Sequence, residues 1–166
     1  MMRERIDDTR LPPASPTWPL QPFDAIRDTV PAGTSFRKEE RTPISLVCKA
    51  LLGLMAFDVL KLGSNFPKMH RLVANWRVTP RTESGDVALH VWQAVNHACV
   101  WYPKRVLCLQ RSAVTTCLLR NYGVRAVMAI GAQSLPFKGH AWTEVDGVAV
   151  NERRDVQRVY DVLDRC

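Results

Sequence analysis

Two residues of this chain, Cys108 and His140, combine a side chain used in covalent catalysis with a suitable local setting, and they lie thirty-two residues apart. Cys108 follows a basic stretch that begins with a proline, residues 103–107, and it opens a segment with helical periodicity. His140 follows a loop at residues 136–139 and opens a segment that alternates like a strand. A thiol at a helix start can act as nucleophile, and an imidazole on a strand can act as its general base. The pair predicts a cysteine hydrolase.

The local charges favour the reactive form of the thiol. Only the thiolate attacks a carbonyl well, and a helix N-terminus stabilises negative charge. Lys104, Arg105 and Arg111 add positive potential around Cys108. The backbone N–H of Cys108 would face a developing oxyanion, and His140 would accept the thiol proton and later protonate the leaving amine. This chemistry needs neither a metal ion nor an organic cofactor.

A histidine base needs a third group that fixes its tautomer, and two residues compete for this role. The Asp-Gly pair at 146–147 predicts a two-residue hairpin turn. Regular pairing across that turn puts Trp142 opposite Asn151, so Asn151 shares a face with His140 while Glu152 points the other way. A bulge or a strand end near residue 151 would bring Glu152 to His140 instead. The sequence leaves both alternatives open.

The cysteine pattern bears on alternative roles. A lone cysteine at a helix start is more often a small buried side chain, and it is the combination with His140 that favours chemistry. Cys48, Cys99 and Cys117 lie in apolar helical stretches and are expected in the core, and Cys166 is expected to be inert. Five cysteines without a CxxC spacing predict no metal site and reduced thiols, and the chain start lacks the apolar stretch of a signal peptide. We expect a cytoplasmic protein.

The hydrophobic pattern predicts an α+β fold, with a helical N-terminal half followed by an antiparallel sheet. Helices are expected over 44–62, 67–77 and 108–121, and another starts near Ser84 or Asp86 and ends at Tyr102. After Gly123 the spacing of the hydrophobic residues changes from the helical period of about 3.6 to the strand period of two. The pattern there predicts strands at 124–131, 140–145 and 148–151, and a short helix within 155–163.

The same pattern sets the expected domain organisation. Residues 1–43 hold seven of the eleven prolines, which predicts an extended arm. Residues 44–166 form one domain, with a helical part at 44–102 and the catalytic helix and sheet at 103–166. The apolar run at 44–62 is interrupted by Lys49 and Asp58, so we expect no membrane span.

The chain is basic, with a formal net charge of +7 and a pI near 9.5. Its cations are dispersed, and it contains neither a recognition helix nor an aromatic-basic signature for RNA. The composition therefore predicts no nucleic-acid partner. Lys104 and Arg105 are interpreted as a solvated face, with an acidic peptide or a partner protein as the alternative for these two residues.

Residues 92–152 resemble the leader-removing B protein of lasso-peptide biosynthesis, a cysteine protease with a transglutaminase-like, papain-like core. The resemblance lies in Cys-Leu-x-Arg-Ser at 108–112 and in Pro-Phe-x-x-His-Ala-Trp-x-Glu at 136–144. Trp-Tyr-Pro at 101–103 and Ile-Gly at 130–131 also match. The resemblance implies a Cys-His-Asp triad with Cys108 and His140 as its first two members. The family's acid falls twelve residues after the histidine, where this chain has Glu152, next to Asn151.

The resemblance also implies a substrate and partners. The substrate would be a ribosomally made precursor peptide, cut between leader and core to free the α-amine of the core. An ATP-dependent cyclase would then join that amine to an acidic side chain. Residues 1–77 lack the winged-helix pattern of a leader-recognition element, so we expect a separate leader-recognition protein. Two alternatives to the protease are an amidase or acyltransferase on the same fold, and a non-catalytic module that presents the leader.

Overall fold

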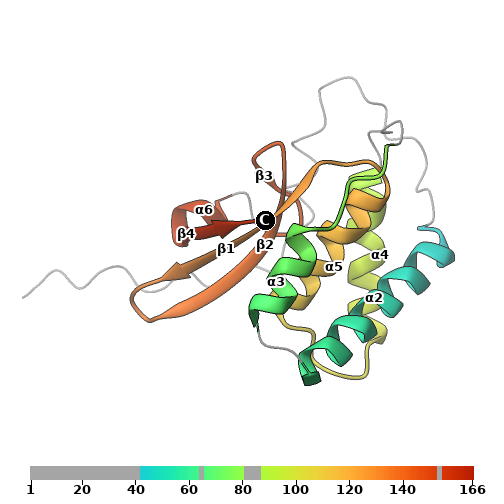
Figure 1. Ribbon diagram of the computed structural model, residues 1–166, viewed down its shortest axis with the longest axis horizontal. Coiled ribbons are helices and arrows are strands. Elements are labelled where there is room, and N and C mark those ends of the chain that lie inside the picture. Colours follow the sequence, from blue (N-terminus) through green and yellow to red (C-terminus); the bar gives the residue numbers. More distant parts are fainter. Residues whose placement is uncertain (1–41, 64–65, 81–86, 153–154) are drawn as a thin grey trace, which may run out of the picture.

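The computed structural model describes residues 42–63, 66–80, 87–152 and 155–166. Within these ranges, four helices precede a four-stranded antiparallel sheet, which confirms the α+β prediction. The helices gather on one side of the molecule and the sheet lies on the other (Figure 1). The elements in chain order are α2 (Ile44–Gly63), α3 (Phe66–Ala74), α4 (Val87–Trp101), α5 (Cys108–Asn121), β1 (Ala126–Gln133), β2 (Lys138–Val145), β3 (Val148–Ala149), α6 (Val156–Val159) and β4 (Asp161–Arg165).

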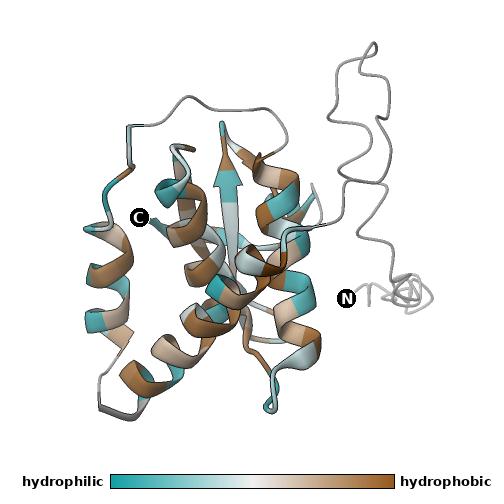
Figure 2. Ribbon diagram, turned by 90° about the vertical axis from the view of Figure 1, so that its right-hand side faces the viewer, coloured by the Kyte–Doolittle hydropathy of each residue, from teal (hydrophilic) through white to brown (hydrophobic). Residues whose placement is uncertain are grey.

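Helix α5 is the central element of the fold. It packs against α2 and α4 on one side and against β1 and β2 on the other. Its boundaries agree with the sequence prediction, because Pro103 and Gly123 bracket the helical pattern. Leu54, Val95, Val114 and Leu119 meet in the main core, and each is almost fully buried. Hydrophobic residues, in brown, recur along these helices between paler and teal segments (Figure 2).

The sheet has the strand order β3-β2-β1-β4. The hairpin turn is as predicted: Val145 pairs with Val148, and Asp146 and Gly147 both have positive φ, at 50° and 78°. Such angles at both central residues fit a type I′ turn, which an Asp-Gly pair favours. The hairpin of β1 and β2 places Gly131 opposite His140.

The predicted helix within 155–163 is mostly wrong. Only Val156–Val159 is helical, and Asp161–Arg165 forms β4 on the free edge of β1. Two backbone hydrogen bonds between Met128 and Cys166, of 2.7 and 2.9 Å, extend this pairing. The unpaired N–H and C=O groups of β1 favour the extended form of the tail, and that long-range demand is invisible to local periodicity.

The two faces of the sheet carry different clusters. Met128 and Ala126 pack into the main core under α5. The opposite face holds a second cluster of Ala129, Trp142 and Val156, against which Tyr160 packs. The polypeptide therefore covers His140's face of the sheet with its own C-terminal segment.

The other predictions have mixed outcomes. Helix α3 ends at Ala74, three residues before the predicted end, and β1 is shifted by two residues. Cys117 is buried as expected, whereas Cys48 is exposed on the outer side of α2 and does not belong to the core. The predicted arm lies outside the described residues up to residue 41, as do Ser84 and Asp86.

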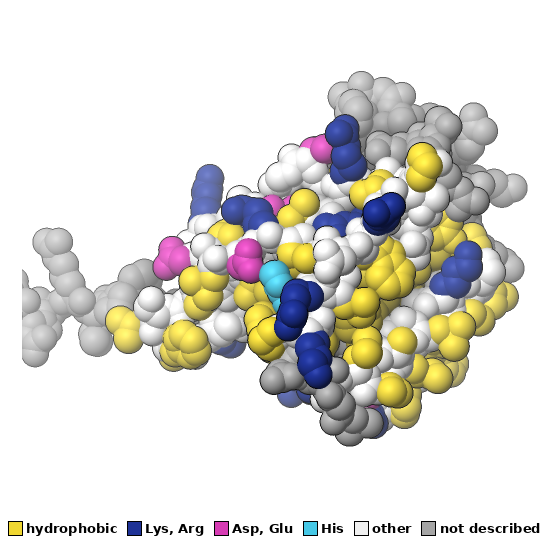
Figure 3. Space-filling view, viewed as in Figure 1, with side chains coloured by type: hydrophobic (Ala, Val, Ile, Leu, Met, Phe, Trp, Pro, Cys, Tyr) yellow, Lys and Arg dark blue, Asp and Glu magenta, His cyan; other side chains and the backbone are white. Residues whose placement is uncertain are grey.

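The cations that the composition predicts to be dispersed can be followed on the molecular surface. Lys and Arg side chains are scattered over the face seen in Figure 3 rather than gathered in one patch. Within the described ranges, none of the helices has the length and apolar content needed to cross a membrane.

Candidate active site

Cys108 is the first residue of α5 and is half-buried. The preceding residue, Leu107, has an extended backbone (φ −83°, ψ 155°) and makes no side-chain cap. The first N–H groups of α5 are thus free of a capping side chain, and they give the helix start a positive local potential. The backbone amides of Ala141 and Leu109 hydrogen-bond to the sulfur of Cys108 and lower the pKa of its thiol.

The structure brings His140 and Cys108 together across the junction of α5 and β2. A hydrogen bond between the two side chains is the largest cause that lowers the pKa of Cys108 below its ordinary value of 9.0. The same bond, followed by the one to Glu152, raises the pKa of His140 from 6.5 to about 9. Both shifts favour a thiolate beside an imidazolium, so the pair is electrostatically prepared for nucleophilic attack.

Glu152 lies beside the imidazole. Its Oε2 is 3.0 Å from Nε2 of His140. Because Glu152 occupies Nε2, the other ring nitrogen, Nδ1, is left for the sulfur of Cys108. This arrangement fixes the tautomer of the ring and its direction.

Asn151, the alternative third member, has a different position from the one that regular strand pairing predicts. Its Oδ1 accepts a 2.6 Å hydrogen bond from the backbone N–H of Thr143, and its Nδ2 donates to Ser112 Oγ at 3.0 Å. The ladder of β3 stops at Ala149, so residue 151 never pairs with Trp142. The side chain of Asn151 replaces the missing strand contact at the edge of β2.

A seam of buried polar groups joins α5 to β2. Ser112 Oγ donates to the carbonyl oxygen of Ala141 at 2.9 Å, and Thr116 Oγ1 lies 3.1 Å from Thr143 Oγ1. Thr143 Oγ1 also donates to the carbonyl oxygen of Ser112 at 3.1 Å. Ser112 lies one helical turn after Cys108, and Ala141 follows His140, so these bonds set the register between the thiol of Cys108 and the imidazole of His140.

Two aromatic rings surround the imidazole. The ring centroid of His140 lies 5.0 Å from that of Tyr160 and 6.2 Å from that of Trp142. Trp142 Nε1 donates to the buried Glu144 at 2.8 Å, and Arg165 Nε pairs with the same carboxylate at 3.0 Å. These contacts hold the rings in place and shield one side of His140 from water.

Sequence reasoning missed Tyr160 entirely. It lies twenty residues after His140, in a segment that we predicted to be helical, and it meets the imidazole only because β4 returns to the sheet. Gly131 is the position that admits Trp142: a Cβ there would come within 2.9 Å of the indole and of the Asp161 carbonyl. The Ile-Gly pair in the sequence was the available signal for that close approach.

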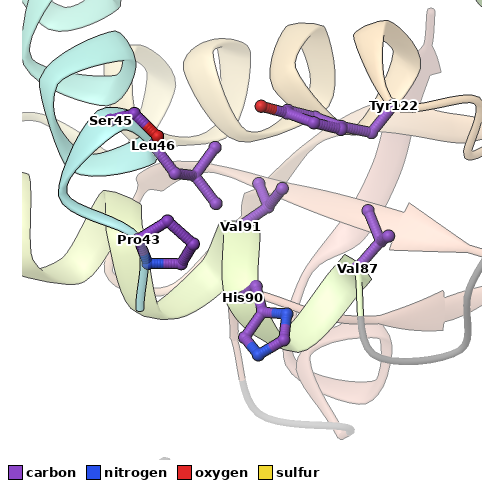
Figure 4. Close-up of a pocket in the computed structure, with 7 residues that line it drawn as sticks. All are labelled: Pro43, Ser45, Leu46, Val87, His90, Val91 and Tyr122. Carbon is purple, nitrogen blue, oxygen red and sulfur yellow. The ribbon is translucent and has the colours of Figure 1, made fainter. Parts of the chain in front are cut away.

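The cavity drawn in Figure 4 is not part of this site. It has a volume of about 160 Å³ and lies between the starts of α2 and α4, next to Tyr122 at the end of α5. Cys108 is at the other end of α5, about 21 Å away along the axis of a 14-residue helix. The described residues that line this cavity include neither Cys108 nor His140.

The sequence model of the transglutaminase-like superfamily matches residues 54–164, which is two thirds of the chain. The chain belongs to the transglutaminase-like superfamily. Enzymes of this superfamily are typically of the cysteine-protease type, in agreement with a thiol and an imidazole that face each other here. No curated protein and no solved structure matches the chain significantly.

The matched segment contains the whole candidate site of this transglutaminase-like chain. It begins within α2 and ends in β4, so it includes Cys108, His140 and Glu152. Among the described residues, no three His, Cys, Asp or Glu side chains converge as metal ligands would. The candidate reacting groups are the thiol and the imidazole, and the carboxylate of Glu152 is the candidate that orients the ring.

Proposed function

We propose that this chain is a cysteine endopeptidase that removes the leader from a ribosomally made lasso-peptide precursor. The observation that carries the proteolytic part is the alignment of Cys108, His140 and Glu152 through two successive side-chain hydrogen bonds. The substrate class rests on the sequence resemblance at 108–112 and 136–144. Superfamily membership supports the chemistry and leaves the substrate to experiment.

The reaction has two covalent steps. The thiolate of Cys108 attacks the scissile carbonyl carbon, and the new C–S bond forms as the C–N bond breaks. His140, protonated in the ion pair, gives its proton to the departing α-amine of the core. Water then loses a proton to His140 and attacks the thioester, which releases the leader's carboxylate and restores the thiolate.

Each neighbouring group has a task in this mechanism. Glu152 holds the imidazole in the reactive tautomer and stabilises its positive charge. The uncapped start of α5 points the backbone N–H of Cys108 at the oxyanion of the tetrahedral intermediate. Trp142 and Tyr160 limit the directions that the ring can adopt.

We further propose that a separate recognition protein delivers the leader and that a cyclase consumes the freed α-amine. Residues 44–63 and 66–74 are helices, and no described strand precedes β1, which supports a separate recognition protein. A precursor gene and a cyclase gene beside the gene for this chain would support the assignment.

The experiment is cleavage of a precursor peptide, followed by mass spectrometry with the recognition protein present. Two fragments whose masses add up to the precursor plus one water support the protease. Cys108→Ala should abolish cleavage, and Cys48→Ala, which removes an exposed cysteine elsewhere, should not. An intact precursor after prolonged incubation would contradict the proposal.

An acyltransferase is the second candidate, because the superfamily match leaves the acyl acceptor open. It would form the same thioester and transfer the acyl group to an amine rather than to water. Adding a primary amine to the cleavage reaction separates the two. A protease gives the leader's carboxylate, and an acyltransferase gives the leader's amide. A non-catalytic module would bind the leader and give neither product.

A further inference from the structure

A second cavity, of about 370 Å³, opens beside the start of α5. It lies between the C-terminal part of α2 and the loop that leads into α5. Its lining consists of Asp58, Lys61, Lys104, Arg105, Leu107 and Gln110. Leu107 directly precedes Cys108, and consecutive Cα atoms are about 3.8 Å apart. The cavity therefore reaches the residue that directly precedes Cys108, while the part of its lining that the structure describes contains neither Cys108 nor His140 themselves.

The cavity is positively charged. It has three cations and one carboxylate in its lining. Asp58 Oδ2 accepts hydrogen bonds from Lys104 Nζ at 3.0 Å and from Tyr102 Oη at 2.9 Å, and these bonds lower the pKa of Asp58. Neither Lys61 nor Arg105 lies within ion-pair distance of a described carboxylate, and Lys61 acts on Asp58 only through its more distant charge, which also lowers the pKa of that carboxyl. Two cations in the lining are thus available to a ligand.

The walls of the cavity are held in place. Gln110 is buried, and its Nε2 donates a 2.7 Å hydrogen bond to the carbonyl oxygen of Leu54. This bond ties the first turn of α5 to α2. On the other side, Lys104 and Tyr102 fasten the loop before α5 to Asp58. The site is therefore formed before a ligand arrives, which limits the entropy lost on binding.

We propose that this cavity binds an acidic side chain of the peptide substrate, within about three residues of the scissile bond. The inference rests on the proposed function, because it places the scissile carbonyl at Cys108. An extended peptide advances about 3.3–3.6 Å per residue, so a Glu or Asp near the cut reaches past Leu107. Its carboxylate meets Lys61 and Arg105, and its methylene groups pack on Leu107. The enzyme would prefer precursors with an acid close to the cleavage point.

A pair of affinity labels tests the cavity without knowledge of the natural substrate. Iodoacetyl-Gly-Glu-amide and iodoacetyl-Gly-Gln-amide differ by one negative charge and are nearly equal in size. In each case the thiolate displaces iodide and a thioether forms. At low salt we expect the Glu label to alkylate Cys108 about three- to tenfold faster than the Gln label. Peptide mapping by mass spectrometry reads the rate at each cysteine, and the ratio at exposed Cys48 should be near one.

Matched variants localise the effect. The double variant Lys61→Gln/Arg105→Gln should bring the ratio at Cys108 close to one. The control Lys68→Gln/Arg125→Gln removes the same two charge types from exposed positions outside the cavity, and it should keep the preference. A ratio near one in the unaltered protein would overturn the proposal. A preference that the first double variant leaves intact would overturn it too.

The outcome separates this proposal from the proposed function. Alkylation requires a reactive thiol and no peptide cleavage. If both labels react equally with Cys108, the acidic site is wrong and the protease is unaffected. If the preference appears but no precursor is cut, the site stands and the protease is wrong. If Cys108 reacts with neither label, the nucleophile fails and both proposals fall.

Discussion

Ser112 Oγ donates a 2.9 Å hydrogen bond to the carbonyl oxygen of Ala141, and this bond joins the helix that begins with Cys108 to the strand that carries His140. Ser112 also accepts a bond from Asn151, so one hydroxyl links α5, β2 and the segment before Glu152. These groups are buried, and a buried polar group that loses its hydrogen-bond partner costs free energy of folding. The polar seam therefore stabilises the fold and sets the distance between Cys108 and His140.

Removing this hydroxyl should destabilise the protein. Ser112→Ala leaves the Ala141 carbonyl and the Asn151 amide without their partner, so we expect the free energy of unfolding to fall by about 1–3 kcal/mol. Urea unfolding followed by circular dichroism measures the change. Thr115→Val is the control, because Thr115 bonds only within its own helix, to the Arg111 carbonyl. Equal losses in the two variants would show that the seam adds nothing.

Replacing Glu152 should change the titration of His140. Its carboxylate raises the pKa of His140, so in Glu152→Gln that pKa should fall below about 9. The catalytic efficiency kcat/KM should drop by about 10²- to 10⁴-fold, as expected for a residue that orients a catalytic base. NMR titration of the imidazole gives the pKa directly.

Asn151→Ala is the comparison for this test. Asn151 bonds to Thr143 and Ser112, so its loss should lower stability while the pKa of His140 stays raised. A fall of the His140 pKa in Asn151→Ala with no change in Glu152→Gln would reverse the two roles.

Two glycines near His140 should respond differently to an added methyl group. In Gly131→Ala the new Cβ meets the Trp142 ring and the Asp161 carbonyl at 2.9 Å, so the indole beside His140 must move. We expect kcat/KM to fall about tenfold or more, because small displacements of catalytic groups are costly. In Gly139→Ala the Cβ meets nothing within 4 Å, and activity should be retained. Comparable losses in both variants would contradict the role of Gly131.

The pH dependence of cleavage should be bell-shaped. The pKa of Cys108 is lowered from 9.0, so the thiolate appears as the pH rises through a value below that. The pKa of His140 is raised to about 9, so the imidazolium disappears as the pH rises through about 9. The ion pair exists between these two pH limits. Because the two groups interact, the rising and falling limbs of the pH profile report apparent pKa values of the pair rather than of either residue alone. Measuring kcat/KM between pH 5 and about 10 checks this, and a rate that keeps rising above the His140 pKa would contradict it.

Local patterns in the sequence predicted the elements that hold the reacting pair. The boundaries of α5 and the hairpin at Asp146 follow from a proline, a glycine and the periodicity between them. Such signals depend only on residues that are close in the sequence, so they can be recognised before the fold is known. The choice between Asn151 and Glu152 was not readable, because it depends on the residue at which the β3 ladder stops.

Features that form where distant segments of the chain meet could not be predicted from the sequence. Tyr160 reaches His140 because the C-terminal residues pair with β1, and this pairing overrides the helical pattern of the tail. The cationic cavity likewise needs α2 and the loop at residues 103–107 to meet. Lys61 is more than forty residues from Lys104, and periodicity contains no information about such contacts.

The most direct measurement of the central claim is the pH dependence of alkylation at Cys108 by iodoacetamide, read residue by residue by mass spectrometry. We expect Cys108 to react at a pH below the ordinary thiol pKa of 9.0, where buried Cys117, with a pKa raised to about 12, stays protected. We also expect His140→Ala to remove this reactivity, because the imidazolium is its largest cause. Two results would contradict the pairing of thiol and imidazole on which the proposed function depends. One is a Cys108 that reacts with the pH dependence of an ordinary thiol, and the other is a reaction rate that His140→Ala leaves unchanged.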